Sequence, residues 1–177
     1  MITVEKTQLE GVLKIVPEVF EDHRGWFMET YNEKLYKESG VEVDFVQDDI
    51  SRSKKNVLRG IHGDKETTKL VSCIYGELFF VVVNCKEESA DFGKWQSFDL
   101  TDKNRIQIFA PAGYGMAYLV RSEEAIFTYK QSSYFVHGRQ FTYQWDDPRF
   151  GIATSFVKKT QVFQTSIVFG LISNVSC

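Results

Sequence analysis

The sequence predicts an all-β domain, a jelly-roll barrel with one or two short helices. The chain of 177 residues holds 15 Phe, 8 Tyr and 3 Trp but only 3 Pro, and aromatic and β-branched residues favour half-buried strands. Apolar or alternating runs also follow one another at a spacing of about 8–12 residues, separated by turn residues, which is typical of sandwiches and barrels.

Two elements are predicted near the N-terminus. Residues 11–20, GVLKIVPEVF, alternate as a strand does, with an interruption near Pro17 because proline cannot donate to a sheet. Residues 32–40, NEKLYKESG, predict a short helix, since Asn32 can cap its start and Gly40 can end it.

From residue 57 onward the pattern predicts strands. Residues 69–84, KLVSCIYGELFFVVVN, read as two strands joined at Tyr75-Gly76-Glu77. Since side chains alternate between the two faces of a strand, Lys69, Val71 and Cys73 should share one face of the first strand. Further strands are expected at residues 95–100, 105–110, 116–121, 125–131 and 140–145.

No linker, repeat or low-complexity segment divides the chain, so residues 1–177 are expected to form one domain. With 25% charged residues and a net charge of −3, the chain gives no electrostatic reason to expect nucleic acid or a membrane surface as a partner. The N-terminal residues lack the pattern of a signal peptide, and an odd number of cysteines, three, fits a reducing compartment. We therefore expect a cytoplasmic protein.

Histidine is scarce, which argues against a metal site. Metal centres in barrels usually draw several histidines and a carboxylate from neighbouring strands. This chain has His23, His62 and His137, none of them in an H-x-H pair, and Met116 stands where a second barrel histidine would be needed. We expect no metal.

A different hypothesis makes His62, in RGIHGDKETTKLV (59–71), a general base. A neutral imidazole has a pKa near the working pH, and removing a proton beside a ketone creates an enolate that needs a cation near its oxygen. Lys69 is placed to supply that cation, and a tyrosine on the opposite side of the substrate would return the proton. From spacing alone a structural histidine, in the core or at the surface, is the favoured interpretation, and the base stays open as the alternative.

The run DHRGWFMET (22–30) suggests a nucleotide contact. Arg24 suits a phosphate, Phe27 could stack on a base, and Glu29 could accept from a base or sugar. An ordinary turn followed by an edge strand explains the same residues.

Several stretches, taken in order, carry a resemblance to a known family. They are FEDHRGWFMETYN, FVQDDISRSKKNVLRGIH, KLV followed by YGELFFVVV, DFGKW, PAGYGMAYLV, FTYKQSSYF and QWDDPRFGI. Over roughly residues 10–151 the chain resembles the dTDP-4-dehydrorhamnose 3,5-epimerases, which are cupin-fold enzymes. The resemblance implies a homodimer of cupin-type jelly rolls that needs neither a metal nor an organic cofactor. It also implies epimerisation of nucleotide-diphospho-4-keto sugars at the carbons beside the ketone.

The resemblance also implies roles for single residues. His62 would be the base, Lys69 would stabilise the enolate, and Tyr129 in FTYK would be the acid on the opposite face. Nucleotide and diphosphate contacts would come from Arg59 and Gln47 and, across a dimer interface, from Arg24, Phe27 and Glu29. Further substrate contacts would involve Asp49, Asn84, Met116 and Tyr134.

Several positions depart from the family pattern. Asp49 stands where relatives have Asn, Met116 where they have a second barrel His, Asn84 where they have Asp, and Phe135 where they have the second Tyr of a pair. Relatives also carry a Ser-x-Lys-Asp segment whose Asp orients the catalytic histidine, whereas residues 148–177 contain no Asp or Glu. Residues 152–177 are thus a divergent tail, and another group must orient His62; the candidates are Asp48, Asp49, Asp64 and Asn84.

We expect an isomerase that inverts C3, or C3 and C5, of a nucleotide-diphospho-4-keto-6-deoxy sugar used for bacterial capsule or other surface polysaccharides. The nucleotide stays open between GDP and dTDP, and the altered pocket favours a substrate such as a GDP-4-keto-heptose. One alternative is a 3,4-ketoisomerase, which would normally show a His pair near residue 62. Another is a sugar-nucleotide-binding protein without turnover, which the missing tail Asp would explain.

Overall fold

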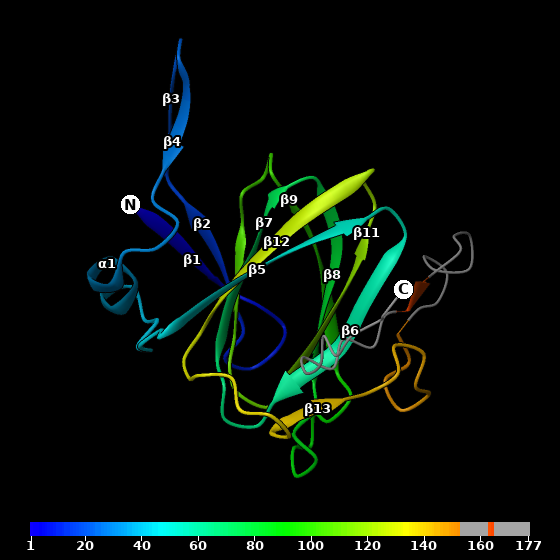
Figure 1. The fold of residues 1–177 in the computed structure, drawn as a ribbon. Coiled ribbons are helices and arrows are strands. Elements are labelled where there is room, and N and C mark those ends of the chain that lie inside the picture. The colour runs from blue at the N-terminus through cyan, green and yellow to red at the C-terminus, as the bar shows by residue number, and fades with distance from the viewer. Residues whose placement is uncertain (153–162, 165–177) are drawn as a thin grey trace.

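The computed structural model describes residues 1–152 and 163–164. Two sheets face each other and form the barrel (Figure 1). The first sheet has the order β1 (Ile2–Lys6), β2 (Leu13–Pro17), β10 (Gln107–Ala110), β7 (Lys69–Tyr75), β12 (Glu124–Gln131), β5 (Gln47–Lys54). The second has the order β13 (Gln140–Thr142), β6 (Val57–Asp64), β11 (Tyr114–Val120), β8 (Glu77–Asn84), β9 (Trp95–Thr101), with β14 (Phe163–Gln164) parallel to β6. The predicted all-β, jelly-roll class is confirmed.

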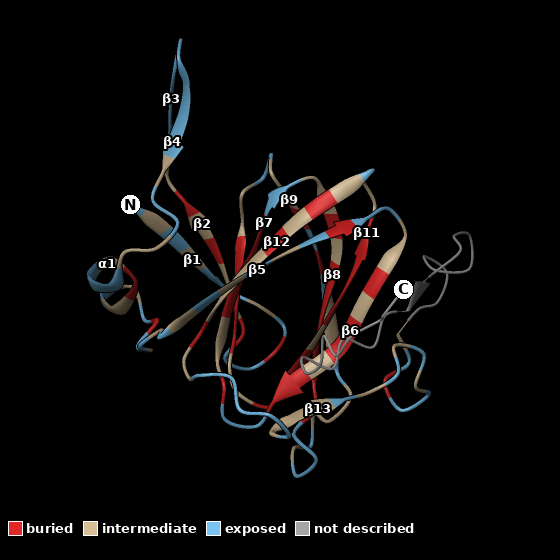
Figure 2. Cartoon of the chain, viewed as in Figure 1, coloured by how far each residue is buried: buried red, intermediate tan, exposed pale blue. Residues whose placement is uncertain are grey.

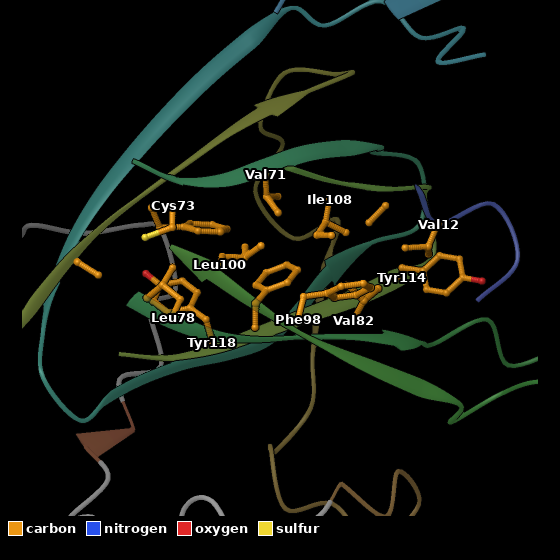
Figure 3. Packing of buried hydrophobic residues seen from close by; sticks show 14 of the residues in the cluster. Val12, Val71, Cys73, Leu78, Val82, Phe98, Leu100, Ile108, Tyr114 and Tyr118 are labelled. Atoms are coloured by element: carbon orange, nitrogen blue, oxygen red, sulfur yellow. The ribbon is translucent and has the colours of Figure 1, made fainter. Parts of the chain in front are cut away.

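The main core lies between the two sheets. Val71, Cys73 and Ile108 point inward from β7 and β10, and they meet Leu78, Val82 and Leu100 from β8 and β9 (Figure 3). Each fully buried side chain of this size stabilises the fold by about 1.5–3 kcal/mol. The prediction that Lys69, Val71 and Cys73 share one face of their strand is therefore correct, and Val71 and Cys73 are part of the core between the sheets.

Strand β8 is apolar on both faces because both faces are covered. Leu78, Phe80 and Val82 belong to the core between the sheets, whereas Val81 and Val83 belong to a second cluster with Phe150. Figure 2 shows the resulting continuous burial along the central strands. The run LFFVVV thus reflects a strand buried on both sides.

The predicted helix is confirmed as α1 (Glu33–Glu38). Asn32 caps it, since its side-chain oxygen accepts from the backbone N–H of Leu35 at 3.1 Å, and Gly40 follows with a φ of +92°. Tyr36 is fully buried against the outer face of the first sheet, and its hydroxyl donates to Gln107 at 2.6 Å.

Strands β3 (Val19–Asp22) and β4 (Gly25–Met28) form a hairpin that projects away from the barrel (Figure 1). Most of it is exposed (Figure 2), and Phe20, Trp26 and Phe27 remain 54%, 51% and 65% accessible. Three large apolar side chains held in solvent on a two-stranded arm are typical of a surface that another molecule covers.

Strand β6 contains a β-bulge beside β11. His62 pairs with Met116 and Arg59 pairs with Tyr118, so β6 advances three residues while β11 advances two. Gly60 sits in the bulge with a φ of +117°, and a Cβ there would lie 2.4 Å from the carbonyl oxygen of Met116. Only glycine fits this close approach of two backbones.

Candidate active site

A cavity of about 430 Å³ opens between the two sheets. Its polar lining comes from β5, β6, β7, β12 and β13, and its inner wall is aromatic. The lining residues are Gln47, Asp49, Ile50, Ser51, Arg59, His62, Asp64, Lys69, Val71, Phe80, Met116, Tyr118, Phe127, Tyr129, Gln131, Phe135, His137, Gly138, Gln140 and Thr142. An apolar pocket with a few convergent polar groups is the usual form of a small-molecule site.

His62 lies on β6 between two neighbouring strands that present very different side chains. Met116 on β11 and Thr142 on β13 are its cross-strand partners. The Nδ1 atom of His62 lies 3.1 Å from the hydroxyl oxygen of Thr142. The Nε2 atom is buried and has no hydrogen-bond partner among the described residues. A buried ring nitrogen that borders a cavity without a partner is available to a ligand.

Burial lowers the pKa of His62 below its ordinary value of 6.5, and the positive charges of Lys69 and Arg59 lower it further. The imidazole is therefore neutral at pH 7, the state in which a histidine can accept a proton.

Lys69 and Tyr129 come from adjacent strands of the opposite sheet. The ammonium nitrogen of Lys69 lies 4.9 Å from the centre of the Tyr129 ring, within the range of a cation–π contact. Burial lowers the pKa of Lys69, while the carboxylates of Asp64 and Asp49 oppose that effect. Burial and the charge of Asp49 raise the pKa of Tyr129 to about 12, so its phenol stays protonated.

Arg59 reaches the same cavity from β6, and its Nε is buried without a hydrogen-bond partner in the described part of the chain. Residues three apart on a regular strand point to opposite faces. Because the bulge at Gly60 takes up one extra residue of β6, Arg59 and His62 point to the same side of the sheet, and both line the cavity. A guanidinium with a free donor is suited to a phosphate.

Asp49 is held by two amides. Nε2 of Gln47 and Nε2 of Gln131 donate to the same oxygen of Asp49 at 2.8 and 2.7 Å. The side-chain oxygen of Gln47 then accepts from the backbone N–H of Phe135 at 2.9 Å. Because a carboxylate only accepts, Asp49 fixes which way both amides point.

Residues 132–139 cross the mouth of the cavity, and an ion pair between Arg139 and the buried Asp64 anchors them. Arg139 donates from Nε to Asp64 at 2.9 Å, and Asp64 also accepts from the backbone N–H groups of Glu66 and Thr67. Burial raises the pKa of Asp64, but these hydrogen bonds and the charge of Arg139 outweigh it, so the pKa lies below its ordinary value. The rim residues Phe135 and His137 are thereby held over the cavity.

The structure brings most of the predicted site residues together. The predicted residues that line the cavity are Gln47, Asp49, Arg59, His62, Lys69, Met116 and Tyr129. Arg24 and Phe27 lie on the projecting hairpin, where Arg24 is paired with Asp22 at 2.6 Å, and Glu29 accepts from Asn32 at 3.3 Å.

Besides the three residues of the hairpin region, two more predicted contacts do not line this cavity. Asn84 is buried at the end of β8, where it donates to Ser89 at 3.2 Å and accepts from the backbone of Lys86 at 3.0 Å, so it organises a turn. Tyr134 is 68% exposed, and its neighbour Phe135 takes the place at the rim. The Ser-x-Lys-Asp position of relatives falls in the tail, which lies outside the described residues apart from 163–164.

Sequence reasoning missed several lining residues. Thr142, Gln131, His137 and Gln140 were not predicted, although Gln131 lies within the FTYKQSSYF stretch and the other three follow it. Only the strand register, which pairs Thr142 with His62, would have identified Thr142.

Two searches of the described residues were negative. Residues 1–152 and 163–164 hold no group of three or more His, Cys, Asp or Glu side chains that could bind a metal ion. No helix within those residues has the length and apolar character needed to cross a bilayer.

Comparisons with known proteins identify the family. The family model of dTDP-4-dehydrorhamnose 3,5-epimerase matches residues 6–167. The dTDP-4-dehydrorhamnose 3,5-epimerase of Methanothermobacter thermautotrophicus is 43% identical over 149 residues, which are 83% of this chain and 80% of that protein. The enzyme of the same name from Salmonella typhimurium is 41% identical over 160 residues, 88% of this chain and 87% of that protein.

A solved structure agrees. The crystal structure of dTDP-6-deoxy-D-glucose-3,5-epimerase from Legionella pneumophila, in complex with dTDP-4-keto-L-rhamnose, superposes with a TM-score of 0.87 at 34% identity, covering 94% of this chain and 89% of that one. Sequence and fold agree over most of the chain, and it belongs to the dTDP-4-dehydrorhamnose 3,5-epimerase family of isomerases.

Proposed function

We propose that this protein epimerises C3 of a nucleotide-diphospho-4-keto-6-deoxy sugar, with C5 as the second centre to be tested. One observation carries the proposal: a neutral imidazole with a free Nε2 shares one cavity with an ammonium and a protonated phenol from the facing sheet. These are the groups needed to remove a proton beside a ketone, hold the enolate and return a proton. As part of the same proposal, the product sugar serves the synthesis of bacterial surface polysaccharides.

The proposed reaction balances without a redox step. Nε2 of His62 takes the proton from C3, and the C–H electron pair forms the C3–C4 double bond as the ketone oxygen becomes an enolate oxygen. The ammonium of Lys69 stabilises that oxygen. The enolate then collapses to the ketone while C3 takes the phenolic proton of Tyr129 from the opposite face, which inverts the centre. No change in ketone position occurs, unlike in a 3,4-ketoisomerase.

The diphosphate is proposed to lie beside Arg59 and Gln47. Support comes from the unpaired Nε of Arg59 and from the thymidine nucleotides named in relatives such as the Legionella complex. Asp49 is one of the departures from the family pattern, and it adds a negative charge where a diphosphate would add more. A GDP-linked substrate, including a 4-keto heptose, is therefore a second arm of the test.

We further propose a homodimer in which the hairpin β3–β4 reaches the partner's nucleotide. Its support is the exposed apolar side chains of Phe20, Trp26 and Phe27, together with the projection of the arm away from its own barrel (Figure 1). In such a dimer Arg24 and Glu29 would act on the partner's substrate.

The function is tested by incubating the protein with dTDP- and GDP-linked 4-keto-6-deoxy sugars in deuterated water. Deuterium at C3 alone would establish a C3 epimerase, and deuterium at C3 and C5 a double epimerase. Incorporation with movement of the ketone to C3 would favour the ketoisomerase. Binding of every substrate without any deuterium would refute the catalytic proposal and favour a non-catalytic binding protein.

Tyr129→Phe separates proton removal from inversion. The variant keeps His62 and Lys69, so deuterium should still enter at C3, whereas the yield of inverted product should fall by about 100-fold because the opposite-face acid is lost. NMR of the product sugar measures both quantities. Tyr118→Phe, which removes the other phenol of the cavity, should leave their ratio unchanged. Equal losses of exchange and inversion in Tyr129→Phe would contradict the assigned role.

A further inference from the structure

We propose that the hydroxyl of Thr142 is the positioning group of His62, taking the place of the missing tail carboxylate. This inference rests on the proposed role of His62 as base. A catalytic imidazole needs a partner on one nitrogen so that the lone pair of the other faces the substrate. The Nδ1 atom of His62 has such a partner in Thr142, at 3.1 Å.

The strand register explains why Thr142 occupies this place. Strand β13 runs antiparallel to β6, and Thr142 stands directly opposite His62. Side chains directly opposite in an antiparallel pair point to the same side of the sheet, with Cβ atoms about 4.5–5.5 Å apart. On the other flank β11 presents Met116, whose thioether is at best a weak acceptor.

The carboxylates considered from sequence are engaged elsewhere. Asp64 accepts from Arg139, Asp49 from Gln47 and Gln131, and Asp48 from Lys130. The tail has no Asp or Glu in residues 148–177. Among the described residues, Thr142 is thus the hydrogen-bond partner of the imidazole.

A hydroxyl fixes the ring without adding a charge. When Nδ1–H donates to the Thr142 oxygen, the Nε2 lone pair is left for the substrate. The neighbouring charges are those of Lys69 and Arg59, both positive, and they favour the neutral ring. The other titratable groups that line the cavity are Asp49, Asp64, Tyr118, Tyr129 and His137. The result is a base that is ready at neutral pH but lacks a carboxylate to stabilise its protonated form.

The test combines ring NMR with kinetics on Thr142→Val, Thr142→Ser and Thr142→Asp. Thr142 is exposed, so these changes disturb little packing. Nitrogen-15 NMR of the His62 ring, assigned with His62→Ala, should show the Nδ1–H form in the wild type and in Thr142→Ser, and a mixture of tautomers in Thr142→Val. The rate constant kcat of Thr142→Val should fall by about 10- to 100-fold with little change in KM, and serine should restore it.

Thr142→Asp tests the pH dependence of the rate, which would not change if Thr142 served packing alone. It should shift the acid limb of the rate profile to higher pH, because a carboxylate stabilises the imidazolium. Thr101→Val, on the opposite edge strand β9 of the same sheet, should change neither tautomer nor pH profile.

The outcomes separate the inference from the function. An Nε2–H tautomer in the wild type, or an unchanged tautomer and rate in Thr142→Val, would overturn the inference. The tautomer population of His62 could change in Thr142→Val while every 4-keto sugar stays unlabelled in deuterated water. That result would uphold the positioning role of Thr142 and refute the epimerase proposal.

Discussion

His62→Ala is expected to abolish deuterium exchange at C3, with a loss of about 10²- to 10⁴-fold, the usual contribution of a general base. The physical reason is that Nε2 is a buried ring nitrogen bordering the cavity with no partner in the described structure. The change takes a hydrogen-bond partner from the hydroxyl of Thr142, which is exposed and can bind water instead, so the melting temperature should change little. Exchange of the C3 proton in deuterated water, followed by NMR, measures the effect.

His137→Ala is the matched control, since His137 also lines the cavity but lies on the rim segment. It should keep most of the exchange activity. If His137→Ala lost exchange and His62→Ala retained it, the base would have been assigned to the wrong histidine.

Lys69→Met should lower kcat by about 10²- to 10³-fold, the effect of removing one stabilising group from an oxyanion. Methionine has a similar length and no charge, so the cavity keeps its shape while the enolate oxygen loses its cation. The same change removes an ammonium whose charged form is disfavoured by burial. The variant should therefore melt at the same temperature as the wild type or higher, while its activity falls.

Lys130→Met provides the comparison. Lys130 follows Tyr129 on β12 but pairs with Asp48 at 2.8 Å, outside the cavity lining. Its loss should leave kcat near the wild-type value. A Lys69→Met enzyme with unchanged kcat would show that another group stabilises the enolate.

The sequence predicted those strands whose buried faces are apolar. Strands β7 and β8 follow the expected residues closely, because inward side chains such as Val71 and Leu78 pack in the core. Strand β5 was not predicted, since its inward residues Gln47, Asp49 and Ser51 line the cavity and give no apolar alternation. The strand that departs from the hydrophobic pattern is thus one that lines the cavity with polar side chains.

The site was predicted in part for a similar reason. His62, Lys69 and Tyr129 were identified through motifs, and the cavity brings them together. The partner of His62 could not be identified from those motifs, because Thr142 reaches it by strand pairing across 80 residues of sequence. The expected carboxylate would have acted on the His62 ring through its charge, over a longer distance. The observed hydroxyl acts on the ring only through a hydrogen bond at contact distance.

The bulge in β6 has a consequence for how this site can change. Arg59 and His62 share the cavity because β6 carries one more residue than β11 between their paired positions. If β6 paired with β11 without this bulge, Arg59 and His62 would stand three residues apart on a regular strand, and Arg59 would turn to the outside even though every side chain of the cavity would still be present in the sequence. The shared placement of Arg59 and His62 is therefore encoded in the bulge, which needs glycine at position 60, a residue that has no side chain of its own to line the cavity.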